Sequence, residues 1–214
     1  MDVTTKAVAL KTTDYKENDK MVLLYSLEYG KISVQAKGVR KSSAKLKFAC
    51  DQFCFGQYEL VKSGDRFTLK TCDQLESFFA LREDIVAYYA ACVVAECLVN
   101  YTEEGQSEPK LFVTTLKALE ALVNNVNPLT VALKYVLDFL RLAGFGLDLS
   151  ENGGVSANAQ VVACVRNLGG LAYDKLDNLD CPQATMKEAL ATCNRYLSHN
   201  FYPLKTVNEL IKLA

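Results

Sequence analysis

The feature that most constrains this chain is a change of hydrophobic period near residue 77. Before that point apolar and polar residues alternate, as in Ile32-Ser33-Val34-Gln35-Ala36. After it the apolar residues recur at helical spacing, beginning with the run from Asp84 to Asn100. A period of two is typical of half-buried strands, and a period near 3.6 is typical of amphipathic helices. The sequence therefore predicts an α+β protein in which an all-β part precedes an all-α part.

The β part, residues 1–79, shows β-prone runs separated by turn residues and contains no long helical stretch. Turn signals at Gly30 and at Ser63-Gly64-Asp65 separate neighbouring runs. The predicted strands are Val3–Leu10, Lys20–Leu27, Ile32–Ala36, Gln57–Lys62 and Arg66–Thr71. Because closing a small sheet removes its exposed edges, we expect these strands to form a small barrel.

The α part, residues 80–214, is predicted to be a helical domain with one irregular region. Pro128 suits a helix start and Gly144 suits a helix end. Residues 144–181 are rich in Gly, Asn and Asp, so we expect an irregular excursion with a short helix near Asn158–Cys164. The predicted helices are Asp84–Asn100, Glu108–Val123, Pro128–Leu142, Ala184–Leu197 and Thr206–Leu213.

Basic residues are concentrated in the β part, although the whole chain has a net charge of −1. Residues 1–80 carry a net charge of +3, whereas the rest carry −4. No acidic residue lies between Tyr29 and Cys50, where six basic residues are interleaved with small ones. Such a loop can lie along a phosphate backbone. The candidate nucleic-acid-binding residues are Lys31, Lys37, Arg40, Lys41, Lys45 and Lys47, extended on the later hairpin by Arg66 and Lys70.

Two features near this loop have competing interpretations. The basic run is either a binding surface or an ordinary solvated surface. The aromatic residues that follow it, Phe53, Phe55 and Tyr58, either stack on bases or belong to the core.

No catalytic constellation is apparent, so we expect a non-enzymatic protein. Neither a phosphate-binding G-x-x-x-x-G-K-[ST] nor a G-x-S-x-G motif occurs, and His199 is the only histidine. The eight cysteines include no C-x-x-C pair and are expected to be free thiols. The N-terminus lacks a basic segment followed by an apolar one, and no apolar run approaches the ~20 residues of a membrane span. We therefore expect a cytoplasmic protein that does not contact membranes.

Several segments together resemble the RecO family of bacterial recombination mediators. The stretch from Lys6 to Lys20 is similar to the family's opening, and Gly30-Lys31 followed by Ala36-Lys37-Gly38-Val39-Arg40-Lys41 is similar to its next segment. Leu75 to Asp84 resembles the family's junction between barrel and helices. Weaker similarity continues through Glu103-Glu104-Gly105 and Leu140 to Phe145.

The resemblance implies an OB-fold barrel and a role in DNA repair at the nucleoid. It implies binding of single- and double-stranded DNA and annealing of complementary strands. It also implies that the protein works with RecR and with single-strand-binding protein to load RecA.

Two further expectations depend on this resemblance. Many family members carry a four-cysteine zinc site after the Gly-Phe that ends a helix, but here neither residues 150–153 nor residues 172–175 contain cysteine. We therefore expect no zinc and no other cofactor. The acidic tail of single-strand-binding protein ends in Phe, so its receptor needs an apolar slot and a cation. The candidate cations are Arg141, Lys187 and Arg195.

Two alternatives stay open at this point. The barrel of a non-catalytic interaction module would bind protein rather than DNA. An enzyme with an unrecognised site would use residues such as Arg82, Asp84 and Glu96.

Overall fold

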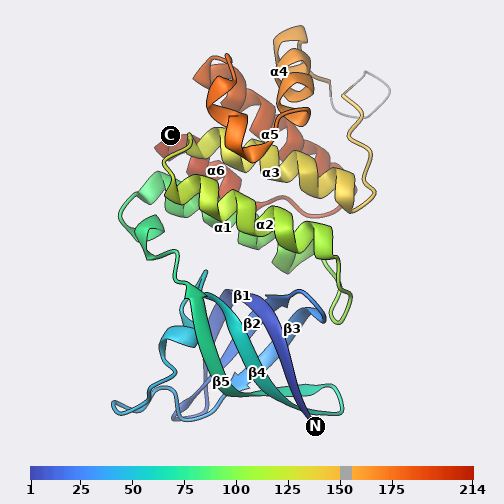
Figure 1. Ribbon diagram of the computed structural model, residues 1–214. Coiled ribbons are helices and arrows are strands. Elements are labelled where there is room, and N and C mark those ends of the chain that lie inside the picture. The colour runs from blue at the N-terminus through green and yellow to red at the C-terminus, as the bar shows by residue number, and fades with distance from the viewer. Residues whose placement is uncertain (150–155) are drawn as a thin grey trace. The chain divides into compact units, whose positions relative to one another are not determined.

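A computed structural model describes residues 1–149 and 156–214, which form two compact units (Figure 1). The barrel unit comprises Met1–Phe79 and Tyr101–Phe112, and the helical unit comprises Ala80–Asn100 and Val113–Ala214. This grouping differs from the predicted division at residues 101–112, which belong with the barrel. The reason is tertiary contact, because the ring of Phe112 stacks on that of Tyr25 and the Ser107 hydroxyl donates a hydrogen bond to the carbonyl of Leu27.

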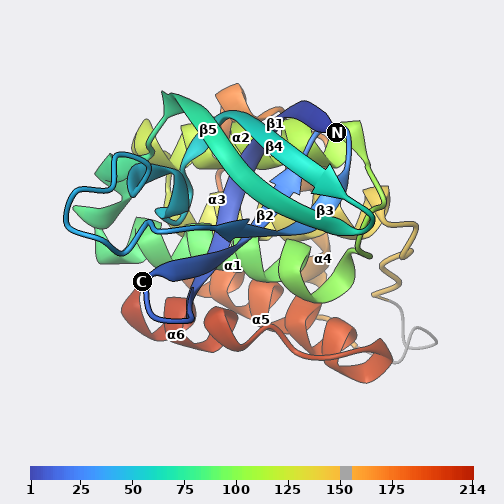
Figure 2. The same cartoon turned by 90° about the horizontal axis from the view of Figure 1, so that it is seen from below.

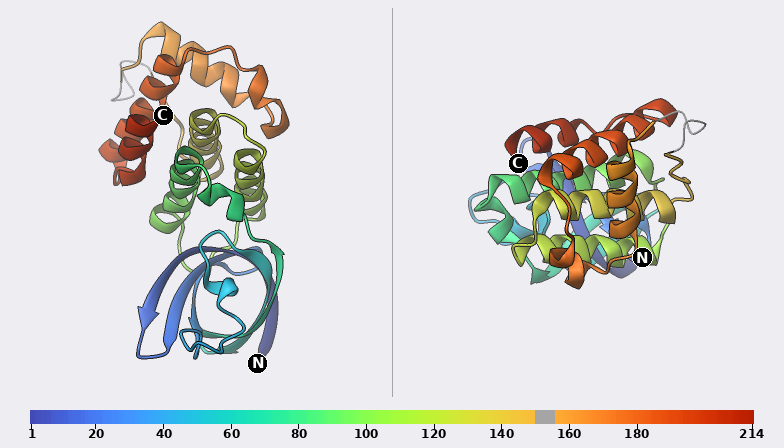
Figure 3. Two further views of the ribbon diagram at one scale, coloured as in Figure 1. Left: turned by 90° about the vertical axis from the view of Figure 1, so that its left-hand side faces the viewer. Right: turned by 90° about the horizontal axis from the view of Figure 1, so that it is seen from above.

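The barrel closes in the strand order β1-β2-β3-β5-β4, which confirms the prediction of an OB-fold barrel followed by helices (Figure 3, left). All neighbouring strands are antiparallel except β3 and β5, which pair in parallel with Val34 opposite Phe67 and Gln35 opposite Thr68. The strands are β1 (Asp2–Tyr15), β2 (Asp19–Ser26), β3 (Gly30–Ala36), β4 (Phe55–Ser63) and β5 (Arg66–Glu76).

The longest strand, β1, extends five residues beyond its predicted end at Leu10 because its two parts pair with different neighbouring strands. Its first part, from Asp2 to Val8, pairs with β4, and its second part, from Ala7 to Tyr15, pairs with β2. The register shifts between Ala9 and Lys11, where the strand bends from one neighbour to the other.

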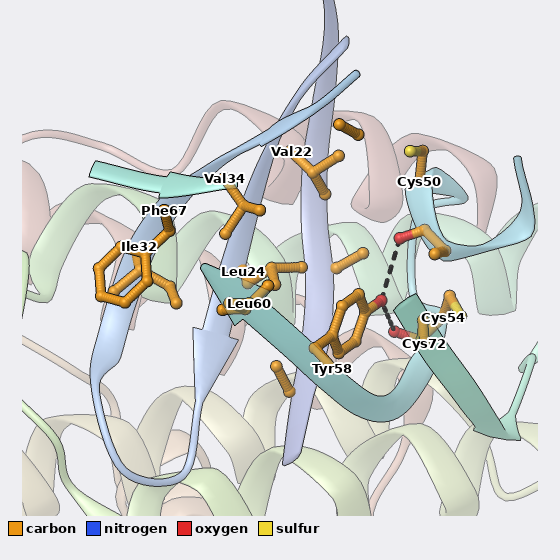
Figure 4. Close-up of a cluster of buried hydrophobic side chains, with 14 of the residues drawn as sticks. Val22, Leu24, Ile32, Val34, Cys50, Cys54, Tyr58, Leu60, Phe67 and Cys72 are labelled. Atoms are coloured by element: carbon orange, nitrogen blue, oxygen red, sulfur yellow. Dashed lines mark hydrogen bonds between the residues drawn. The ribbon is translucent and has the colours of Figure 1, made fainter. Parts of the chain in front are cut away.

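The barrel interior is filled by the apolar residues of the alternating pattern, with Leu24 and Leu60 fully buried (Figure 4). A short 3-10 turn, η1 (Phe48–Cys50), contributes the buried residues Ala49 and Cys50. The hydroxyl of the buried Tyr58 donates to the carbonyl of Ala49 at 3.0 Å, which satisfies its polar atom inside the core. This bond ties η1 to the barrel.

The helical unit is organised around α3, whose residues from Leu129 to Leu140 are all buried. Asn127 caps α3 by accepting from the Thr130 amide at 3.1 Å, and Gly144 follows its end with a φ of +78°. The α-helices are α1 (Ile85–Tyr101), α2 (Pro109–Val123), α3 (Pro128–Leu142), α4 (Ala159–Gly169), α5 (Gln183–Asn200) and α6 (Lys205–Leu213). None of them, within the described residues, is long and apolar enough to cross a membrane.

The irregular region predicted over 144–181 contains more helix than expected. Helix α4 continues to Gly169 rather than ending near Cys164, and a 3-10 helix, η4 (Tyr173–Asn178), follows it. The extension buries Leu168 against the unit, a tertiary gain that local composition does not reveal. Residues 150–155 lie outside the described part of the chain.

Candidate nucleic-acid interface

The basic segment of residues 37–47 forms an irregular loop between β3 and η1, reaching out from the barrel in Figure 2. Its start is held by the carboxylate of Asp19, the first residue of β2. One oxygen accepts from the Gly38 amide and the other from the Gln35 side chain, both at 2.8 Å. The hydrogen bond from the Gly38 amide makes the largest contribution, followed by that from the Gln35 side chain, and both lower the pKa of Asp19 below its ordinary value. The carboxylate thus stays ionised and anchors the loop above acidic pH.

Arg40 is a second anchor of this loop. Its guanidinium forms an ion pair with Asp14 at 3.1 Å and donates to the carbonyl of Lys16 at 3.3 Å. Its backbone amide also donates to the carbonyl of Asn18. The predicted binding residue Arg40 therefore has a structural role in joining the loop to the β1–β2 turn, and its charge is partly neutralised.

The remaining loop lysines point to solvent. Lys37, Lys41 and Lys45 are exposed and form no ion pair with any residue in the described ranges. Lys47 donates to the carbonyl of Ser42 at 3.1 Å, which curls the loop back on itself. The structure thus presents a run of uncompensated positive charge on a loop whose base is fixed.

The other predicted basic residues differ in their surroundings. Lys31, at the start of β3, is partly buried, and this desolvation lowers its pKa below the ordinary value. Lys70 forms ion pairs with Asp2 at 2.6 Å and Glu59 at 4.0 Å, so it adds little net positive charge. Arg66 is exposed at the start of β5.

Two hollows of about 420 Å³ each flank the β4–β5 turn, sharing Phe67 in their walls. The first is lined by Tyr15 and Arg66, and Tyr15 is 41% exposed. The second is lined by Tyr29 and Lys62, with the Lys62 ammonium 5.3 Å from the centre of the Tyr29 ring. Aromatic rings beside cations are the usual components of a surface that stacks bases and holds phosphates.

These rings are not the aromatic residues proposed from the sequence. Phe53 and Tyr58 are buried in the barrel, and the half-buried Phe55 packs edge-on against Phe112. The core interpretation is therefore correct for Phe53 and Tyr58. The exposed Tyr15 was missed, because nothing in the local pattern distinguishes an exposed tyrosine at a strand end from a buried one.

Two of the residues considered for an unrecognised enzyme site, Asp84 and Glu96, have structural roles. The Asp84 carboxylate caps α1 by accepting from the Val86 amide at 2.7 Å. The Glu96 carboxylate accepts from the amides of Lys205 and Thr206 at the start of α6. Each carboxylate thus satisfies backbone donors at the start of a helix.

The cations considered for a partner tail are dispersed in the helical unit. Arg141 is paired with Asp138 at 3.3 Å, Arg195 donates to the Thr192 hydroxyl, and Lys187 is half-buried. A different cation, Arg166, borders an apolar hollow of about 400 Å³. The apolar lining consists of Leu147, Leu149, Val162 and Val165. Sequence reasoning missed this arrangement, because it joins α4 to a segment outside any predicted element.

The residues present do not match a four-cysteine zinc site. Within the described ranges no group of three or more His, Cys, Asp or Glu side chains is placed to hold a metal ion. Residues 172–175 lie in and beside η4 and contain no cysteine, whereas residues 150–153 lie outside the described chain.

Comparison with known proteins supplies the family. The model described as "Recombination protein O N terminal" matches residues 1–78, and that described as "Recombination protein O C terminal" matches residues 82–156. A DNA repair protein RecO of Clostridium novyi is 33% identical over 148 residues. The chain belongs to the RecO family. Proteins of the same description from Desulfitobacterium hafniense and Bacillus subtilis are 34% and 30% identical over 145 and 146 residues.

The chain covers only part of these RecO relatives. The matches include 69%, 68% and 68% of this chain but 58%, 53% and 57% of the three relatives, in the same order. The family-model match over residues 1–78 contains all five strands of the barrel and the basic loop.

Proposed function

We propose that this RecO-family chain is a non-enzymatic, DNA-binding recombination mediator in DNA repair. It binds single- and double-stranded DNA, anneals complementary strands and, with RecR, helps to load RecA on DNA covered by single-strand-binding protein. A cytoplasmic, nucleoid-associated location accords with this role. The single observation that carries the proposal is the fixed basic loop on a RecO-type barrel, in which Lys37, Lys41 and Lys45 carry uncompensated charge.

The loop lysines supply phosphate contacts, and the neighbouring hollows supply stacking surfaces. Phosphate contacts release counterions, so their contribution falls as salt rises. Stacking on Tyr15 or Tyr29 depends less on salt and tolerates any base. Together the two parts of the surface favour single strands of any sequence.

Charge reversal at two loop lysines is expected to weaken DNA binding for all sequences alike. In the variant Lys41→Glu/Lys45→Glu, the plot of log affinity against log salt should become less steep by about 0.7 per lost contact on single strands, hence about 1.4 for two. Fluorescence anisotropy with labelled oligonucleotides at several salt concentrations measures this slope.

The matched control places the same charge change on the helical unit, at the exposed residues Lys117 and Lys205. Lys117→Glu/Lys205→Glu should keep the parent slope. Equal slopes for the loop variant and the parent protein would place the DNA surface elsewhere. A parent protein that binds no DNA at low salt would instead favour the alternative in which the barrel binds protein.

We expect the purified protein to hold no stoichiometric zinc. The cysteines of a structural site are missing after Gly144-Phe145 and after Gly169-Gly170, and a structural zinc needs about four thiolate or imidazole ligands. Elemental analysis of protein purified without chelator checks this. One zinc per chain would contradict it.

The hollow beside Arg166 is our candidate receptor for the tail of single-strand-binding protein. Its leucine and valine lining suits a terminal aromatic ring, and the guanidinium suits the adjacent carboxylate. Arg166→Glu should weaken the affinity for a tail peptide roughly tenfold or more, because a hydrogen bond to a charged group contributes about 1.5–3 kcal/mol.

Anisotropy with the labelled peptide measures this affinity, and Arg141→Glu and Arg195→Glu are the comparison variants. If Arg166→Glu binds the peptide like the parent protein and either comparison variant binds it more weakly, the tail site lies beside the residue changed in that comparison variant and not beside Arg166. No binding by the parent protein would remove this partner from the proposal.

A further inference from the structure

A pair of thiols meets in the helical unit, although 17 positions separate the two cysteines in sequence. Cys164 lies in the middle of α4, and Cys181 directly precedes Pro182, the residue that caps the start of α5. The Cys181 thiol donates to the sulfur of Cys164, and the two sulfurs are 2.8 Å apart. Packing of α4 against α5 brings these two cysteines together, and no local sequence motif predicts the pair.

The two thiols differ in access. Cys164 is only 4% exposed, and burial, assisted by its neighbour Cys181, raises the pKa of its thiol to about 12. Cys181 is partly exposed at the surface of the unit. Because oxidants react with accessible sulfur, Cys181 is the thiol of this pair that reacts with them first. Cys164, whose sulfur is 2.8 Å from that of Cys181, is then in position to react with the product.

We propose that Cys181 and Cys164 form an oxidisable dithiol site that converts reversibly to a disulfide on exposure to hydrogen peroxide. In the first step the Cys181 sulfur attacks one peroxide oxygen and the O–O bond breaks. The sulfur becomes a sulfenic acid, and the second oxygen leaves as water with the thiol proton. In the next step the Cys164 sulfur attacks the Cys181 sulfur and the S–O bond breaks. The hydroxyl leaves as a second water with the Cys164 proton.

The electrons balance, because two thiols are oxidised to one disulfide while one peroxide is reduced to two waters. A small dithiol reductant reverses the reaction by thiol–disulfide exchange. The new bond closes a loop that contains the end of α4 and the whole of η4. It therefore adds a covalent cross-link between α4 and the residue that precedes the start of α5.

The barrel contains a matched internal control. Cys54 and Cys72 also interact with each other, but they are only 1% and 6% exposed and lie in the core (Figure 4). Proximity alone would allow both pairs to oxidise. If access decides, only the Cys164–Cys181 pair reacts while the protein is folded.

The test treats the full chain with peroxide under native conditions, blocks remaining thiols in denaturant and maps tryptic peptides by mass spectrometry. Cleavage after Arg166, Lys175 and Lys187 places Cys164, Cys181 and Cys193 on separate peptides. We expect one linked species, Cys164 to Cys181, lighter than the two reduced peptides by two hydrogen atoms and lost on treatment with a dithiol. Cys54 and Cys72 should be blocked in full.

Two variants separate the steps, with circular dichroism to verify folding. In Cys164→Ser, Cys181 should accumulate as a sulfenic acid that a cyclic diketone traps in higher yield than in the parent protein. In Cys181→Ser, Cys164 should stay reduced. Irreversible oxidation of Cys181 without the link, or a link from Cys181 to Cys193 instead, would overturn the proposal, as would oxidation of the barrel pair alone.

Discussion

Replacing Asp138 by alanine is expected to lower the free energy of unfolding of the helical unit by about 3–5 kcal/mol, the cost of breaking a buried ion pair from one side. Asp138 and Lys134 lie one turn apart on α3, and the Lys134 ammonium is 2.9 Å from a carboxylate oxygen of Asp138. The side chains of Asp138 and Lys134 are 8% and 5% exposed. The Lys134 ammonium also donates to the carbonyl of Gly169 at the end of α4. Without Asp138 this ammonium would be a buried charge whose remaining acceptor is the neutral carbonyl of Gly169. Arg141, which is also paired with Asp138, is itself a cation and cannot take the place of the carboxylate.

Urea unfolding followed by the helical circular-dichroism signal measures this cost. The double variant Lys134→Met/Asp138→Leu removes both charges and should recover most of the loss, since apolar residues often replace a buried pair without cost. Arg141→Ala is the exposed comparison, with an expected change of about 0–1 kcal/mol. A double variant no more stable than Asp138→Ala would show that packing at this position, and not the unpaired charge, decides the stability.

Gly30→Ala is expected to destabilise the barrel unit in two ways. Gly30 has a φ of +60°, a left-handed conformation that costs an L-residue about 1–2 kcal/mol. A Cβ at this position would also lie 1.9 Å from the carbonyl oxygen of Gln106, which is backbone and cannot rotate away. Displacing that segment adds about 1–3 kcal/mol, the usual cost of overpacking.

Gly38→Ala is the matched control for Gly30→Ala. Gly38 has a similar φ of +67°, but no atom lies within 4 Å of a Cβ built there. Unfolding of the two variants should therefore differ by the contact with Gln106 alone. Hydrogen exchange at Gly105, whose amide donates to the carbonyl of Lys31 at 3.0 Å, should rise in Gly30→Ala and not in Gly38→Ala. Equal stabilities of the two variants would contradict this account.

The sequence alone determined the order of strands and helices and the position of the basic loop. Local rules were sufficient for these features: a period of two marks the strands, a period near 3.6 marks the helices, and Pro128 and Gly144 mark the ends of α3. Charge is also local in sequence, so the run of basic residues from Lys37 to Lys47 is apparent from residue types alone. The family followed from the order and spacing of several such segments.

Tertiary structure alone decided which residues of each pattern face solvent and which distant residues meet. Packing against the barrel assigned residues 101–112 to the first unit, and barrel closure buried Phe53 and Tyr58 while leaving Tyr15 exposed. The pairing of Arg40 with Asp14 and the meeting of Cys164 with Cys181 likewise depend on elements far apart in the chain. The physical reason is that burial and pairing are properties of surfaces brought together in space, whereas periodicity describes only one segment at a time.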